Sequence, residues 1–242
     1  MTWSIVARDP ATGEVGIAVA TCAFAVGARV PFIRTGVGAV ATQSFVNPFY
    51  GLRGLELLAA GAAPDAVLAS LVGPDEGRDD RQVHLMDRHG RSAAYTGAGC
   101  VPWCGHMIGE GFSVAGNMLA GPAVVDDTAA SFRAGAGKPL AERLLDALAA
   151  GEAAGGDKRG KQSAALLVHD REEYALVDLR VDDGPDPIVE LRRLLGVWGG
   201  RFRHYRACMP SRARPSGIVG REEIERRIAA SMAEADRSGQ AK

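Results

Sequence analysis

The sequence has no long apolar run, few cysteines and almost no net charge, and each absence excludes a class of protein. No stretch reaches the roughly 20 apolar residues that a membrane-spanning helix needs. Arg8 and Asp9 interrupt the start of the chain, where a secretory signal would be apolar. We therefore expect a cytoplasmic protein with no membrane partner, in which the four cysteines stay reduced. Because the formal net charge is -1, nucleic acid is not an expected partner.

Glycine, by contrast, is abundant and separates short apolar runs that are typical of strands. The 31 glycines indicate many tight turns. In Glu14–Thr21, bulky residues alternate with small ones, which indicates a strand covered on both faces. Strands are predicted at residues 2–9, 14–21, 30–36, 37–44, 82–87, 91–97, 112–119, 162–170 and 174–182. The glycine-rich segment from Cys100 to Gly111 is predicted to be a loop.

Helical patterns lie between these groups of strands. Asn47 is a credible N-cap with Pro48 at the first helical position, and the leucines that follow form a stripe that ends at Gly61. Further helices are predicted at residues 64–72, 122–134, 139–150 and 187–196. Because strands and helices come in clusters, the sequence favours an α+β fold in which helix layers pack on antiparallel sheets.

The composition changes after residue 198. We expect residues 1–198 to form one domain and residues 199–242 to form a basic C-terminal appendage with a short helix at 221–235. The basic stretch of the appendage contains Arg201, Arg203, His204, Arg206, Arg212 and Arg214. A solvated or subunit-contacting tail is the favoured interpretation, and contact with RNA is the alternative.

Threonine at position 2 permits a specific chemistry if Met1 is removed. Thr2 would then carry a hydroxyl and a free α-amine, whose pKa is roughly 7.7–8.0 in model peptides. The neutral amine can act as the general base that activates the neighbouring hydroxyl, so one residue supplies both nucleophile and base. Threonine is common at this position, so the residue alone is weak support for catalysis.

Several distinctive segments, in this order along the chain, resemble those of one protein family. They are TWSIVARDPATGEVGIAVAT, RTGVGAVATQS, NPFYGLRGLELLAAG, CVPWCGH, VAGNMLAGP, GGDKRGKQSAALLV and DLRVDDGPDPIVELRRLL. The chain resembles, over about residues 2–196, the bacterial domain-of-unknown-function family numbered 1028. That family is placed in the N-terminal-nucleophile (Ntn) hydrolase superfamily, so the resemblance implies a four-layer αββα sandwich and cleavage of an amide bond by Thr2.

The resemblance also implies roles for polar residues at the strand ends. Thr21 would contact the N-terminal amine, although the family pattern leads us to expect a longer polar side chain at the adjacent Cys22. Arg29, or alternatively Arg34, would be the cation that lowers the pKa of the nucleophile. The end of the fourth strand, which comprises Thr42, Gln43 and Ser44, would offer backbone N–H groups to a developing oxyanion, and Asn117 would be its side-chain donor. The alternatives are a surface cation for Arg29, a strand-forming role for Thr21 and a turn role for Asn117.

Two further clusters offer candidates for substrate binding. Trp103 and His106 could line a pocket, with the indole as a flat apolar wall. Arg159 could clamp a substrate carboxylate, and the alternative is an exposed loop charge. The spacing of Cys100, Cys104 and His106 is not usual for structural zinc, so we expect no metal and no cofactor.

The sequence therefore predicts an amidohydrolase in which Thr2, Arg29 and Asn117 are catalytic. Its substrate would be a small-molecule or peptide amide, and the chain would be a homo-oligomer by analogy with strand-paired folds of this size. Two alternatives stay open. One is a non-catalytic binding or scaffold protein that retains the fold, and the other is a cysteine- or metal-dependent hydrolase that uses Cys100, Cys104 and His106.

Overall fold

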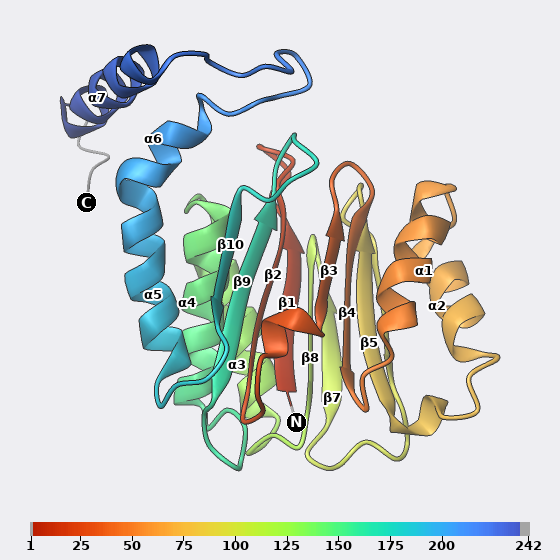
Figure 1. Cartoon of the computed structure of the whole chain (residues 1–242). Coiled ribbons are helices and arrows are strands. Elements are labelled where there is room, and N and C mark those ends of the chain that lie inside the picture. Colours follow the sequence, from red (N-terminus) through yellow and green to blue (C-terminus); the bar gives the residue numbers. More distant parts are fainter. Residues whose placement is uncertain (1, 238–242) are drawn as a thin grey trace. The chain divides into compact units, whose positions relative to one another are not determined.

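Two antiparallel sheets lie at the centre of the structure, a computed structural model that describes residues 2–237 (Figure 1). The larger sheet contains, in spatial order, β10 (Val177–Val181), β9 (Ser163–His169), β2 (Val15–Thr21), β1 (Thr2–Arg8), β8 (Phe112–Asn117) and β7 (Gly105–Gly109). The smaller sheet contains β3 (Pro31–Arg34), β4 (Gly38–Ser44), β5 (Arg81–Asp87) and β6 (Ser92–Thr96). The first strand of the chain is thus an interior strand, because β2 and β8 flank it on both sides.

Helices cover the outer face of each sheet. The helices α1 (Pro48–Ala59) and α2 (Pro64–Val72) pack on the smaller sheet, and α3 (Ala123–Ala134) and α4 (Leu140–Ala153) pack on the larger one (Figure 1). Short 3₁₀ turns, η1 (Val26–Ala28) and η2 (Arg78–Asp80), precede β3 and β5. As predicted, Asn47 caps α1, because its side chain accepts a hydrogen bond from the backbone N–H of Phe49. Among the described residues, no helix has the length and apolar character that crossing a membrane requires.

The chain divides into two compact units between Leu191 and Arg192, within α5 (Pro187–Val197) and before the predicted boundary after residue 198. The second unit also contains the π-helical segment η3 (Trp198–Phe202), α6 (Arg203–Arg206) and α7 (Arg221–Arg237). Inside this unit, the Arg201 guanidinium forms an ion pair with Glu225 at 2.7 Å, and His204 Nδ1 lies 2.8 Å from Ser231 Oγ. The helix predicted at 221–235 is confirmed as α7, while residues 238–242 and Met1 lie outside the described residues.

The prediction of an α+β chain with antiparallel sheets and helix layers is confirmed, but one loop prediction is wrong. The segment predicted as a loop from Cys100 to Gly111 contains strand β7, which pairs with β8 from Gly105 opposite Gly116 to Gly109 opposite Phe112. Glycines at three positions hid the strand signal, because they lower the local strand propensity. The turn between β7 and β8 needs one of them, since Gly111 has a φ of 70°.

The two faces of β1 have different surroundings, and this difference positions the candidate site. Trp3 and Ile5 face the helices on the outer side of the larger sheet, whereas Ser4 and Val6 face the smaller sheet. The space between the sheets is apolar on one side, where Val6, Val15, Ile17, Val19, Val26, Val30, Ala39, Ala41, Met86 and Ala165 form one cluster. On the other side it is lined by polar side chains, which reach the start of β1.

The small face of β2 is a requirement of packing against α4, and this generates a stability prediction. A Cβ atom added at Gly16 would lie 2.5 Å from Leu144 Cδ1, and Leu144 is fully buried. We predict that Gly16→Ala lowers the free energy of unfolding by about 1–3 kcal/mol through overpacking, measured by urea denaturation. The matched control is Gly121→Ala, where an added Cβ has no atom within 4 Å. Equal stability of the two variants would contradict this account of the β2–α4 contact.

Candidate active site

Thr2 lies where the interior strand of the larger sheet begins. Its side chain is buried, and it pairs with Asn117 of β8 on one side while β2 runs along the other. The hydroxyl of Thr2 lies 3.3 Å from Thr21 Oγ1. Register and the alternation of side chains place Thr2, Thr21 and Asn117 on the face that looks toward the smaller sheet. The structure therefore brings together three of the residues predicted from the sequence.

The smaller sheet contributes a fourth predicted residue, through a different group from the one expected. The sequence prediction used backbone N–H groups at the end of β4, but the N–H of Thr42 donates to Val30 O. Instead, the side chain of Gln43 crosses the space between the sheets, and its Nε2 lies 3.4 Å from the carbonyl oxygen of Thr2. Asn117 Nδ2 reaches the same oxygen at 3.5 Å. Both contacts are long, so the Thr2 carbonyl is weakly held from two directions.

A buried chain of polar side chains continues from this point into the interior. Gln82 Oε1 accepts from Gln43 Nε2 at 2.8 Å and from Asn117 Nδ2 at 2.9 Å. Ser4 Oγ donates to Gln43 Oε1 at 2.7 Å and lies 2.8 Å from His84 Nε2. Ser4, Gln82 and His84 were not predicted from the sequence. The sequence feature that could have indicated them is a pair of polar residues two positions apart within a mostly apolar strand.

His84 is the titratable member of this chain. Its Nδ1 lies 2.8 Å from Ser113 Oγ, so both ring nitrogens have hydroxyl partners. Burial, and to a smaller degree the charge of His106, lower the pKa of His84 from 6.5 to about 3. The imidazole is therefore neutral at physiological pH, with one nitrogen that donates and one that accepts.

Strained backbone gathers at the same end of the sheets. Within residues 2–237, three non-glycine residues have a positive φ: Ala25 at 54°, Ser44 at 68° and Met118 at 56°. Ser44 ends β4, Met118 follows β8 and Ala25 lies shortly after β2, and these three strand ends surround Thr2. Such conformations cost about 1–3 kcal/mol each and cluster at functional sites, so they independently indicate a site at this end.

A loop with a buried carboxylate lies across the ends of β2 and β8. Asp157 is almost fully buried, and its Oδ2 accepts from the backbone N–H of Cys22 at 2.8 Å. The same residue forms an isolated bridge with Leu119, just beyond Asn117. Arg159, predicted to clamp a substrate carboxylate, forms an ion pair with Asp157 at 3.1 Å. A substrate carboxylate would have to share this guanidinium with Asp157.

The Cys100–His106 segment lies partly at the site. The carbonyls of Val101 and Trp103 accept from the backbone N–H groups of Met118 and Leu119, which holds the indole's segment next to Asn117. His106 is exposed on β7, and its Nδ1 lies 2.9 Å from Thr96 Oγ1. Partial shielding of the ring lowers the pKa of His106.

The structure does not favour a cysteine or metal centre in this segment. Burial raises the pKa of Cys100, whose thiol donates to Arg81 O, and burial also raises the pKa of Cys104. A nucleophilic cysteine needs the opposite shift. No group of three or more His, Cys, Asp or Glu side chains in residues 2–237 is arranged to hold a metal ion.

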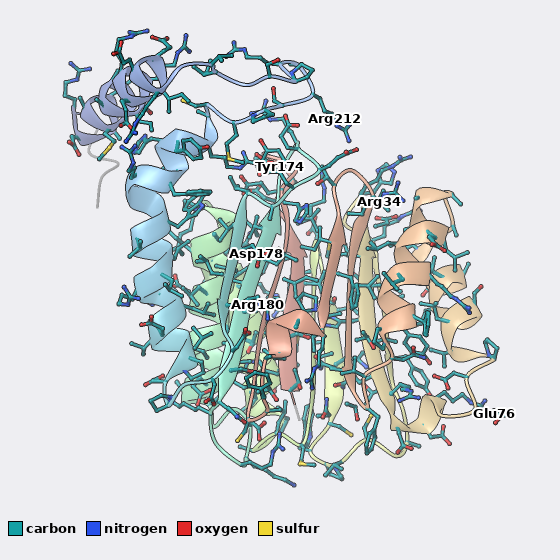
Figure 2. All side chains as sticks on the ribbon, in the orientation of Figure 1. Arg34, Glu76, Tyr174, Asp178, Arg180 and Arg212 are labelled. Atoms are coloured by element: carbon teal, nitrogen blue, oxygen red, sulfur yellow. The ribbon has the colours of Figure 1, made fainter. Side chains whose placement is uncertain are left out.

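The two candidate cations differ in their distance from Thr2. Arg34 lies at the far end of β3, opposite Gly38, where Figure 2 shows it away from the start of β1. Arg29 lies at the near end, directly before the Val30 carbonyl that accepts from Thr42. Its side chain is exposed and makes no ion pair within residues 2–237. Of the two cations, only Arg29 is at the end of β3 that lies near Thr2.

A separate hollow of about 300 Å³ lies between α1 and α2, on the outer side of the smaller sheet. Its wall includes Asp75, which accepts from Tyr50 Oη at 2.7 Å and from Arg81 Nε at 3.2 Å. The Tyr50 hydrogen bond is the main reason that the pKa of Asp75 falls to about 2. Because these polar groups already satisfy one another, we place the candidate site at Thr2 and not in this hollow.

Comparison with known proteins identifies the family. The model of the family of unknown function DUF1028 matches residues 2–191. The chain belongs to DUF1028. A solved DUF1028 structure, protein SPO2555 from Silicibacter pomeroyi, is 32% identical to this chain and superposes on it with a TM-score of 0.84. The match covers 90% of this chain and 96% of SPO2555. A second solved structure, Anbu (ancestral beta-subunit) from Yersinia bercovieri, is 11% identical, covers 81% of this chain and 93% of its own, and has a TM-score of 0.41. Curated protein sequences give no match.

The depressed pKa of His84 predicts how the stability of this DUF1028 chain depends on pH. In the unfolded chain the imidazole binds a proton near pH 6.5, while in the folded chain it does so only near pH 3. Its contribution is fully present above pH 6.5 and is lost as the pH falls toward 3. We predict a loss of about 2 kcal/mol from pH 7 to pH 5 in urea denaturation.

The variant His84→Gln should lose this part of the pH dependence, although it is less stable at every pH. His89→Gln, on the exposed turn after β5, should keep the wild-type slope. If His84→Gln retained the slope as well, His84 would not be the buried neutral group described above.

Proposed function

We propose that this DUF1028 chain is an amidohydrolase of the N-terminal-nucleophile type, with Thr2 as its nucleophile after removal of Met1. The observation that carries the proposal is the position of Thr2. It begins an interior strand, its hydroxyl is 3.3 Å from Thr21, and the side chain of Asn117 lies beside it. The strained residues at the three neighbouring strand ends support the same location.

The four-layer αββα sandwich of Ntn hydrolases is part of the proposal. Two antiparallel sheets, with α1 and α2 on the smaller one and α3 and α4 on the larger one, support it. So does the way the fold delivers the start of the chain. An N-terminal nucleophile has to begin a strand whose neighbours supply polar groups, and β1 lies between β2 and β8 in that way.

The proposed reaction uses groups that the site brings together. The neutral α-amine of Thr2 takes the hydroxyl proton while Oγ1 attacks the amide carbonyl carbon. The oxyanion that forms accepts a hydrogen bond from Asn117 Nδ2, through the N–H that otherwise reaches Thr2 O at 3.5 Å. The C–N bond then breaks, and the leaving amine takes the proton from the Thr2 ammonium. Water hydrolyses the resulting ester and restores the hydroxyl.

The remaining predicted residues are assigned to the edges of the site. Arg29 supplies positive charge at the near end of β3, and Thr21 orients the Thr2 hydroxyl. Trp103, His106, Ser44 and Arg159 lie on segments that adjoin β8, β4 and the end of β2, and we assign them to substrate binding. Phe24 and Phe45, which follow the ends of β2 and β4, are 58% and 69% exposed. Their exposure favours small-molecule or peptide amides with apolar groups, so these amides come first in a substrate screen.

A screen of amides against matched variants tests the proposal. We predict that Thr2→Ala loses at least about 1,000-fold in kcat, because alanine has no hydroxyl to attack the amide carbonyl. Thr2→Ser should keep part of the activity, since it retains both the hydroxyl and the α-amine. Thr12→Ala, on the exposed turn before β2, is the control and should be unchanged. Equal turnover by wild type and Thr2→Ala would refute the assignment.

A Cys104→Ser variant distinguishes the cysteine alternative in the same screen. The Cys104 thiol donates to Cys100 O and does not contact Thr2. We predict wild-type turnover for this variant, also after incubation with a chelator. Loss of turnover in Cys104→Ser with full activity in Thr2→Ala would move the reaction to the Cys100–His106 segment.

A further inference from the structure

Gln82 has its amide orientation fixed by groups that can only accept hydrogen bonds. It is fully buried on β5, and its Nε2 lies 2.8 Å from Gly116 O and 3.1 Å from Gly105 O. A carbonyl oxygen accepts and never donates, so the nitrogen end of the amide must face β7 and β8. Thr96 Oγ1, at 2.9 Å, shares these N–H groups. The backbone of the larger sheet therefore determines which way the side chain of Gln82 points.

The orientation of Gln82 then determines the orientation of the Asn117 amide and agrees with that of Gln43, whose Nε2 also donates to Ala115 O at 3.0 Å. With its nitrogen facing the larger sheet, Oε1 receives hydrogen bonds from Gln43 Nε2 at 2.8 Å and from Asn117 Nδ2 at 2.9 Å. Both partners must present their nitrogen to this one oxygen. The same nitrogens are the ones that reach the carbonyl oxygen of Thr2, at 3.4 and 3.5 Å. The weak contact from Asn117 to Thr2 thus depends on one strong acceptor, whereas the Gln43 amide is also held by the Ala115 carbonyl.

The donor and acceptor roles of the remaining buried polar side chains follow in the same way. With the nitrogen of Gln43 committed, its Oε1 accepts the Ser4 hydroxyl proton at 2.7 Å. Ser4 Oγ is then free to accept, so His84 Nε2 carries the ring proton, and Ser113 donates to Nδ1. This arrangement of protons gives Ser4, Gln43 Oε1 and both ring nitrogens of His84 a partner, and it contains the neutral Nε2–H tautomer of His84.

We propose that Gln82 is a positioning residue for the Thr2 site. It acts through Asn117, which it leaves with one N–H fixed and the other directed at Thr2. The oxygen of Asn117 has no hydrogen-bond donor within residues 2–237, so the amide is held by its nitrogen alone. Without Gln82 Oε1, the side chain of Asn117 would lose its one short hydrogen bond and its orientation beside Thr2. This inference rests on the proposed function for its catalytic consequence only.

The first test measures how fast Thr2 reacts. The probe is a hexyl-substituted β-lactone. Thr2 Oγ1 attacks its carbonyl carbon, the ring C–O bond breaks, and the hydroxyl proton passes to the released alkoxide. Gln82→Met removes the amide at similar volume. We predict a fall of at least tenfold in the second-order rate of Thr2 acylation, followed by intact mass and peptide mapping.

The control for this test is Met86→Ala, on the same face of β5 and in the apolar cluster. It creates a cavity and destabilises the core. It should change the acylation rate by less than threefold. Equal losses in both variants, or no loss in Gln82→Met, would overturn the proposal, because a positioning role requires more than general destabilisation.

The second test reads the orientation without any chemistry at Thr2. In wild-type protein, ¹⁵N NMR should show His84 as the neutral Nε2–H tautomer. The side-chain amide protons of Asn117 should exchange slowly with solvent, and fast in Gln82→Met but not in Met86→Ala. An Nδ1–H tautomer, or exchange unaffected by Gln82→Met, overturns the proposal. If wild-type Thr2 is not acylated while the NMR results hold, the proposed function fails and the role of Gln82 in holding Asn117 stands.

Discussion

Hydrogen bonding without water is the constraint on which this structure depends. Polar side chains buried between two sheets have to find all their partners in the protein, since an unpaired group costs about 1–3 kcal/mol. Here the partners come from both sheets at once. Gln82 of β5 binds the carbonyls of β7 and β8, and Gln43 of β4 reaches across to Thr2 and Ala115. The polar chain therefore fixes how the sheets face each other, in addition to lining the start of β1.

The apolar side and the polar side of the interior have different roles. The apolar cluster around Ile17 and Met86 holds the sheets together through burial of side chains from both. The polar side carries directional bonds, which define the orientation of amides and of the neutral His84 imidazole. Strained residues at the strand ends around Thr2 raise the conformational free energy of the folded chain on this polar side. The proposed catalysis at Thr2 uses the polar side, while the apolar side contributes stability to the pair of sheets.

Much of the fold follows from local sequence signals, but the site depends on pairings that the sequence does not express. Alternation in Glu14–Thr21 and the Asn47–Pro48 cap predicted the strand β2 and the helix α1 correctly. Nothing local indicates that β1 pairs with β8, more than 100 residues later, as Thr2 and Asn117 do. Gln82 and His84 were missed for this reason, since a polar residue inside a strand acquires its meaning only from the opposite sheet. Resemblance to a family pointed to Thr2 and Asn117, while the Gln82 contacts required the structure.

The central claim requires that Thr2 carry a free α-amine, because a nitrogen in a peptide bond cannot act as a base. The mass of the intact protein, purified from cells that express the full sequence and measured without proteolysis, tests this most directly. The account predicts a mass lower than that of the full chain by one methionine residue, with Thr2 as the first residue in the fragment spectrum. A mass that includes Met1 in all of the protein would contradict the account.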